Sequence, residues 1–67
     1  MTIGIAIAVR RQALGLTQAE LGRRAGLKRE YVCRIEHNGL PNLTLKTIRK
    51  LALALETKAS ALLAETE

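Results

Sequence analysis

Apolar side chains recur at helical spacing along most of the chain. The clearest run is Leu45, Ile48, Leu51 and Leu55, which places one apolar residue on the same helix face at every turn. Turn signals are few and lie at Gly15, at Gly26 and across residues 38–42. The pattern predicts five short helices, at about residues 3–14, 18–25, 29–37, 44–55 and 57–64.

The first of these segments allows two interpretations. Ile3, Ile5, Ile7 and Val9 alternate with small residues, as they would in a strand. Ile3, Ile7 and Leu14 also fit helical spacing, and a lone strand has no partner in a chain that is otherwise helical. We therefore expect a helix.

The second segment carries specific start and stop signals. Thr17 and Glu20 have the spacing of a capping box, in which each side chain bonds the backbone N–H of the other residue. Gly26 supplies the left-handed residue that ends such a helix. Gly22 lies inside it, where glycine costs about 1 kcal/mol relative to alanine, and a close crossing by another helix would explain its presence. The segment predicts two helices at a steep angle, joined by a short turn.

Composition narrows the class of protein. Sixty-seven residues suit a single domain spanning 1–67, and aliphatic residues with one Tyr and no Phe or Trp favour an all-α core. The net charge of +5 favours a polyanionic partner. A single cysteine fits a cytoplasmic protein, and the longest apolar run is far shorter than the roughly 20 residues that span a membrane.

The third segment is polar on most of its surface. From Lys28 to His37 only Val32 and Ile35 are aliphatic, so a helix over 29–37 buries one narrow side and exposes a charged one. Lys28 and Arg29 lie at the helix N-terminus, where positive charge opposes the dipole. A local rule broken in this way often marks a functional site, and the exposed face has the character of a helix that enters a major groove.

Catalysis and metal binding find little support. Cys33 and His37 lie four residues apart on one face, but two ligands do not make a zinc site and the chain has no other Cys or His. Nothing orients His37 as a base for a Cys33 nucleophile. We expect no enzyme activity, no metal, no cofactor and no small-molecule ligand.

The stretches "GLTQAELGRRAGL", "YVCRIEHNG" and "LTLKTIRKLALAL" together resemble the helix-turn-helix of the XRE family, which includes lambda repressor and Cro. The resemblance covers nearly the whole chain and implies a five-helix lambda-repressor-like fold. This sequence departs from the family pattern in two places. Lys28 replaces the usual hydroxyl cap, and the segment between Glu36 and Leu45 is one residue longer than in the common pattern.

The resemblance also implies roles for individual residues. Base contacts are expected from Lys28, Arg29, Glu30 and Arg34. Phosphate contacts are expected from Gln18, Tyr31 and Asn38. Arg11 and Glu36 match an internal ion pair of several family members.

Proteins of this family usually bind DNA as two-fold dimers. The outward position of Leu53 and the apolar last helix suggest an interface formed by Leu53, Ala59, Leu62 and Leu63. We expect a homodimer on a pseudo-palindromic double-stranded operator, acting as a Cro-like repressor or as a restriction-modification controller protein. The alternative is an antitoxin-type module of the same fold, whose chief partner is another protein.

Overall fold

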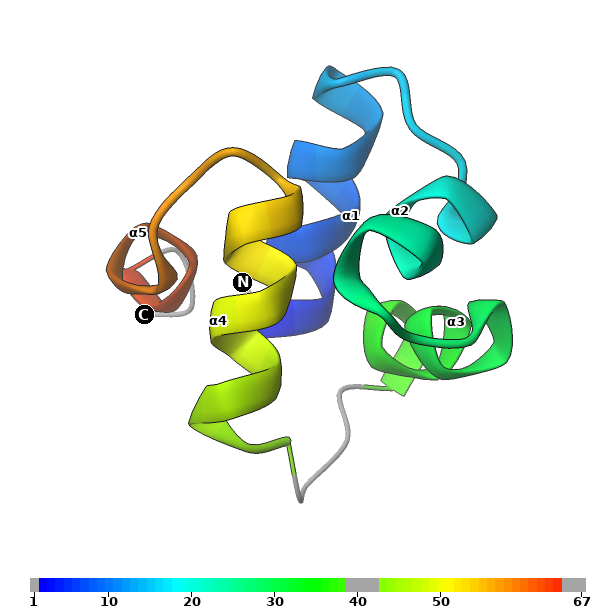
Figure 1. Ribbon diagram of the computed structural model, residues 1–67. Helices are drawn as coiled ribbons and strands as arrows, with labels where there is room; N and C mark the ends of the chain where they lie inside the picture. The colour runs from blue at the N-terminus through cyan, green and yellow to red at the C-terminus, as the bar shows by residue number, and fades with distance from the viewer. Residues whose placement is uncertain (1, 39–42, 65–67) are drawn as a thin grey trace.

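The computed structural model describes residues 2–38 and 43–64. Within these ranges the chain forms five α-helices and no strand (Figure 1): α1 (Ile3–Ala13), α2 (Gln18–Ala25), α3 (Arg29–Asn38), α4 (Leu45–Ala54) and α5 (Ala59–Ala64). The prediction of five helices is confirmed, and each observed end lies within two residues of the predicted one. None of the described helices is long and apolar enough to cross a membrane.

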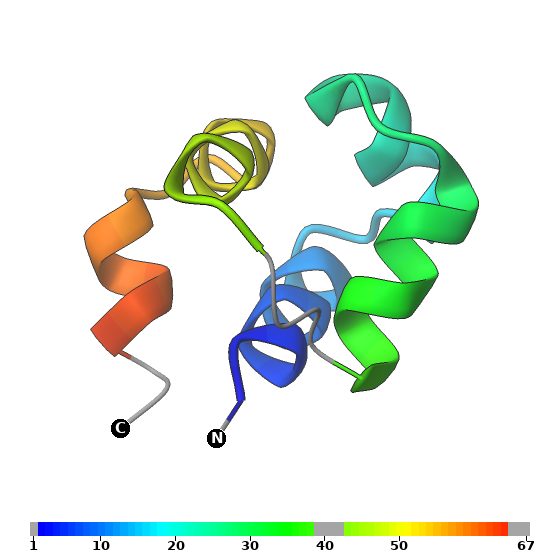
Figure 2. The same ribbon diagram turned by 90° about the horizontal axis from the view of Figure 1, so that it is seen from below.

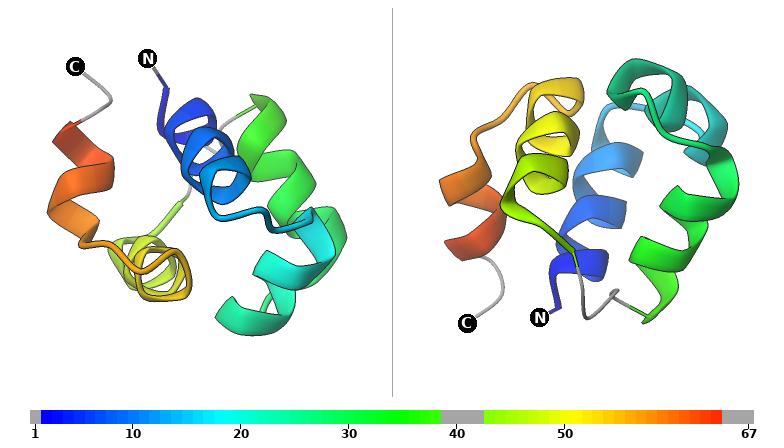
Figure 3. Two further views of the ribbon diagram at one scale, coloured as in Figure 1. Left: turned by 90° about the horizontal axis from the view of Figure 1, so that it is seen from above. Right: turned by 60° about the horizontal axis from the view of Figure 1, so that its bottom comes forward.

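Helix α1 lies between α3 and α5, which flank it on opposite sides (Figures 2 and 3). Helix α2 contacts α3 and α4, and α5 contacts α4 and α1. Six fully buried side chains form the centre of the core. Helices α1, α2, α3 and α4 and the C-cap residue of α4 contribute them: Ile7, Leu21, Val32, Ile35, Leu51 and Leu55. The two inward residues predicted for the third helix are therefore confirmed.

Threonine caps start three of the helices. The hydroxyls of Thr2, Thr17 and Thr44 accept hydrogen bonds from backbone N–H groups one turn ahead. At α2 the capping box is complete, because Glu20 Oε1 accepts from Thr17 N at 2.9 Å while Thr17 Oγ1 accepts from Glu20 N at 3.0 Å. The bond from the Thr17 backbone lowers the pKa of the Glu20 carboxyl below its usual range.

Glycine allows close backbone approach at two points. A Cβ atom at Gly22 would lie 2.6 Å from the carbonyl oxygen of Leu27, so the turn after α2, and not another helix, excludes a side chain there. The helix crossing expected at Gly22 is instead found at Gly4, where a Cβ atom would collide with the carbonyl oxygen of Ile35. This approach brings the backbones of α1 and α3 together.

Two hydrogen bonds connect α1 to the end of α4. Arg10 donates from Nε to the Leu55 carbonyl at 3.0 Å and from Nη2 to the Glu56 carbonyl at 3.2 Å. Glu56 has a φ of 57°, a left-handed conformation that residues other than Gly rarely adopt. It also faces Arg24 in an exposed ion pair at 3.5 Å. Exposed pairs contribute little, so this corner is held mainly by the bonds from Arg10, by backbone hydrogen bonds such as Thr57 N to the Ala52 carbonyl, and by the buried Leu55 side chain.

We predict that Glu56→Gly is more stable than Glu56→Ala by about 1 kcal/mol, because alanine keeps the left-handed strain that glycine removes. Both variants lose the ion pair with Arg24, so their difference isolates the backbone. Urea unfolding of the two variants measures it, and equal free energies of unfolding would contradict the assigned strain.

Candidate nucleic-acid interface

The outer face of α3 is a continuous polar surface. Burial of Val32 and Ile35 against α1 and α2 fixes the rotation of the helix, and the remaining positions follow from it. Between Arg29 and His37, five residues are consequently exposed: Arg29, Glu30, Cys33, Arg34 and His37. Lys28, just before the helix, is exposed as well. All four side chains predicted to face base edges therefore lie on the surface.

The N-terminus of α3 has no side-chain cap among the described residues. The Lys28 carbonyl accepts from the N–H groups of Tyr31 and Val32 at 3.0 and 3.1 Å, which closes the first turn. In that part of the chain the N–H groups of Arg29 and Glu30 have no protein acceptor. Open N–H groups and the helix dipole favour an anion at such an end.

A charged network joins the first three helices beside this face. Arg11 Nε lies 2.7 Å from Glu36 Oε2, and Arg11 Nη2 lies 3.0 Å from Glu36 Oε1. Arg11 also donates from Nη1 to the Leu16 carbonyl at 2.7 Å. Only 12% of the Arg11 side chain and 6% of the Glu36 side chain are exposed. The hydrogen bond to Glu36 raises the pKa of Arg11, so the guanidinium stays charged.

Gln18 is attached to the same network. It is the first residue of α2, it is half-buried, and its Nε2 donates to Glu36 Oε1 at 3.0 Å. The family resemblance predicted only a phosphate contact for Gln18, and the sequence analysis did not predict its hydrogen bond to Glu36. No periodicity could have indicated it, because the bond joins residues 18 apart on two helices.

The other predicted site residues fall in different surroundings. Tyr31 is half-buried and packs against the core. Asn38 ends α3, but its side chain lies outside what the structure describes, as do residues 39–42.

The four residues predicted for a dimer interface divide into exposed and buried ones. Leu53 is 81% exposed and Leu63 is 41% exposed. Ala59 is half-buried against the core. Leu62 is 3% exposed and belongs to the protomer's own core, so the prediction needs correction at this residue: its side chain offers no surface to a partner.

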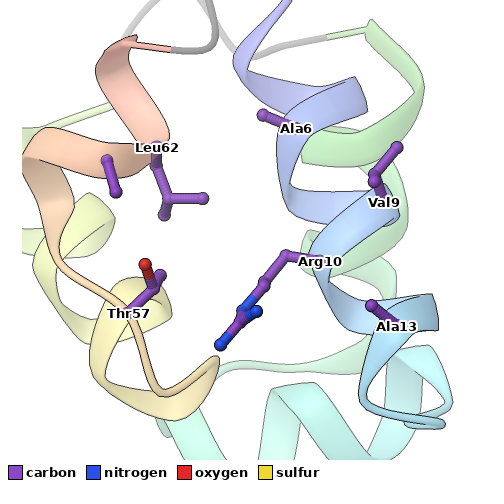
Figure 4. Close-up of a pocket in the computed structure, with 7 residues that line it drawn as sticks. Ala6, Val9, Arg10, Ala13, Thr57 and Leu62 are labelled. Carbon is purple, nitrogen blue, oxygen red and sulfur yellow. The ribbon is translucent and has the colours of Figure 1, made fainter.

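A cavity of about 290 Å³ lies between α1 and α5, apart from the α3 face (Figure 4). Small side chains leave this space open, and Arg10 extends from α1 toward Thr57 beneath it (Figure 4). In residues 2–38 and 43–64, no three His, Cys, Asp or Glu residues lie close enough together to hold a metal ion.

Comparisons with known proteins agree with this geometry. A family model described as helix-turn-helix, HTH_3, matches residues 7–62. The restriction-modification controller protein C.AhdI from Aeromonas hydrophila is 37% identical, with a TM-score of 0.84 over 90% of this chain and 89% of that one. No curated protein sequence matches the chain significantly.

Two further solved structures are similar at comparable coverage. SinR, the master regulator for biofilm formation, was solved in complex with DNA. It is 29% identical, with a TM-score of 0.85 over 92% of this chain and 98% of that one. The DNA-binding domain of the P22 c2 repressor is 25% identical, with a TM-score of 0.85 over 94% of this chain and 82% of that one.

We predict that Arg11→Met lowers the free energy of unfolding by about 3 to 5 kcal/mol, because it leaves the Glu36 carboxylate buried without its partner. The double variant Arg11→Met/Glu36→Met removes both charges and is expected to recover most of that loss. Urea unfolding measures both, with Arg23→Met as an exposed control. A loss below about 1 kcal/mol in the single variant would show that Glu36 is not left as an unpaired buried charge.

Proposed function

The chain belongs to the helix-turn-helix family of DNA-binding transcription regulators, and from this premise we propose that it reads a specific operator through α3. The observation that carries the proposal is the exposed face of α3, where Lys28, Arg29, Glu30 and Arg34 lie along a helix whose first N–H groups have no acceptor among the described residues. A helix of this kind fits the major groove of B-DNA, whose width matches an α-helix with its side chains.

Four side chains are proposed to read base edges. Arg29 and Arg34 suit bidentate pairing with guanine, since the guanidinium offers paired donors. Glu30 can accept from the amino group of cytosine, and Lys28 can donate to guanine. Their exposure supports this assignment, because none of the four side chains has to leave a partner within residues 2–38 and 43–64 before DNA binds.

Contacts to the DNA backbone are proposed for Gln18, Tyr31 and Asn38. For Gln18 the proposal is supported by its place at the start of α2, where backbone N–H groups and the helix dipole favour a phosphate. Such contacts fix the position of the protein on the duplex without reading its sequence.

The functional unit is proposed to be a cytoplasmic homodimer of a single-domain chain. Leu53, at 81% exposure near the end of α4, is the most exposed large apolar side chain described, and Leu63 of α5 is exposed as well. These two residues, with Ala59 at the edge, form the proposed interface. A two-fold dimer would present two α3 helices to half-sites about 34 Å apart, on a pseudo-palindrome.

We place this regulator among repressors and controller proteins that act by binding rather than by catalysis. The similarity to C.AhdI, a restriction-modification controller protein, favours this class. An antitoxin-type module remains the alternative, and an operator-binding test separates the two.

Selection from a randomised duplex pool at near-physiological salt tests the proposal. We expect an enriched pseudo-palindrome, bound more tightly than random DNA by a factor of about 10³ or more. Steeply salt-dependent binding without enrichment would show that the protein binds DNA only non-specifically, through its positive charge. Absence of binding would favour a protein partner.

Arg34→Ala is expected to relax the preference at one base position of the half-site, with a loss of about 1 to 3 kcal/mol in discrimination. The same substitution at Arg23, an exposed residue of α2 outside the α3 face, serves as the control and should leave the preference unchanged. Binding to every single-base variant of the selected operator measures both. Equal losses on all duplexes would refute base reading by Arg34.

Leu53→Glu is expected to weaken dimerisation, because two carboxylates would meet at an apolar interface. Sedimentation equilibrium over a range of concentrations should show a shift of at least tenfold in the dimer Kd. Val9→Glu, at another exposed aliphatic residue outside the interface, should behave as the wild type. A wild-type chain that stays monomeric on and off DNA would overturn the interface.

A further inference from the structure

The orientation of the Gln18 amide is fixed by a neighbour that can only accept hydrogen bonds. Gln18 Nε2 lies 3.0 Å from Glu36 Oε1. An ionised carboxylate has no proton to give, so the nitrogen of the amide, and not its oxygen, has to face Glu36. The reverse orientation would bring the amide oxygen against a carboxylate oxygen at the same distance.

Glu36 is itself held in place. Its two oxygens accept from Arg11 at 2.7 and 3.0 Å, and its side chain is 6% exposed. Two parallel bonds from a planar guanidinium leave the carboxylate little freedom to rotate. The Gln18 amide therefore donates to an acceptor that Arg11 of α1 already holds in place.

Three donors at the start of α2 are left without a protein acceptor in the described part of the chain. They are the second side-chain N–H of Gln18 and the backbone N–H groups of Gln18 and Ala19. The next backbone N–H, that of Glu20, is bonded to Thr17. Donors gathered at a helix N-terminus are matched to a phosphate oxygen.

We propose that Glu36 is a positioning residue for DNA binding: it holds the Gln18 amide with a donor available to one backbone phosphate and ties that contact to α3. The inference rests on the proposed function. Glu36 lies on the same helix as the residues proposed to read bases. One carboxylate thus sets the spacing between the phosphate contact of α2 and the reading face of α3, and Glu36 itself touches no DNA.

The test uses the selected operator with one phosphate at a time replaced by an uncharged methylphosphonate. For the wild type we expect several positions in each half-site where replacement weakens binding, each by about tenfold, the effect of losing one hydrogen bond to a charged group. Gln18→Ala should bind unmodified DNA more weakly and lose the penalty at one of these positions alone, which identifies the phosphate that Gln18 contacts.

Two double variants separate positioning from stability. Arg11→Met/Glu36→Met removes the charges and the acceptor, whereas Arg11→Met/Glu36→Gln removes the charges and keeps an amide oxygen as acceptor. We expect the first to lose the methylphosphonate penalty at the Gln18 position and the second to keep it, although both lack the ion pair. If both keep the penalty, or both lose it, the acceptor at residue 36 does not position Gln18 and the proposal is overturned.

The hydrogen bond between Gln18 and Glu36 can also be followed directly in the wild type, so this test does not depend on the folding of any variant. The hydrogen bond between Gln18 Nε2 and the Glu36 carboxylate gives a scalar coupling in NMR spectra, which should persist when the operator is added. Loss of the coupling on binding would overturn the proposal. A wild type that binds no duplex selectively would instead refute the function on which the inference rests.

Discussion

The ion pair between Arg11 and Glu36 is the interaction on which the arrangement of the first three helices depends. Arg11 reaches from α1 to the carboxylate on α3 and to the Leu16 carbonyl before α2, so one guanidinium contacts all three segments. Taken out of water, neither charge is tolerable without the other. Such a pair is weak evidence for stability, but it specifies the relative position of the helices, since bidentate geometry admits few alternatives.

Around this pair, close backbone approach sets the depth at which the helices meet. Gly4 lets α1 approach the backbone of α3, and Gly22 lets the turn after α2 fold back over its own helix. A methyl group at Gly4 would force α1 away from α3, and one at Gly22 would displace the turn that follows α2. Packing and electrostatics therefore support the same geometry, which is typical of sequences that specify one structure.

The exposed face of α3 consists of the residues that the core does not bury. Six buried aliphatic side chains from α1 to α4 and its C-cap hold the scaffold. With the inner side of α3 packed against that core, Arg29, Glu30 and Arg34 lie on the surface, and Glu36 alone of its described acidic and basic side chains is buried, against Arg11.

Local patterns in the sequence were sufficient for the elements and for the exposed face. Helical spacing, the Thr17 and Glu20 capping box and Gly26 are short-range signals, because the atoms involved lie within one turn of each other. The inward side of α3 followed from the spacing of Val32 and Ile35 in the same way.

Contacts between distant segments were decided only by the tertiary structure. Three contacts join different parts of the fold: Arg10 bonds the end of α4, Gly4 approaches α3, and Gln18 bonds Glu36. Leu62 was assigned to a partner surface and instead fills the core. The sequence by itself determined where the helices form and which way α3 faces, because these depend on neighbours one turn away. What each surface side chain meets across the fold was decided by packing, because it depends on the relative placement of whole helices.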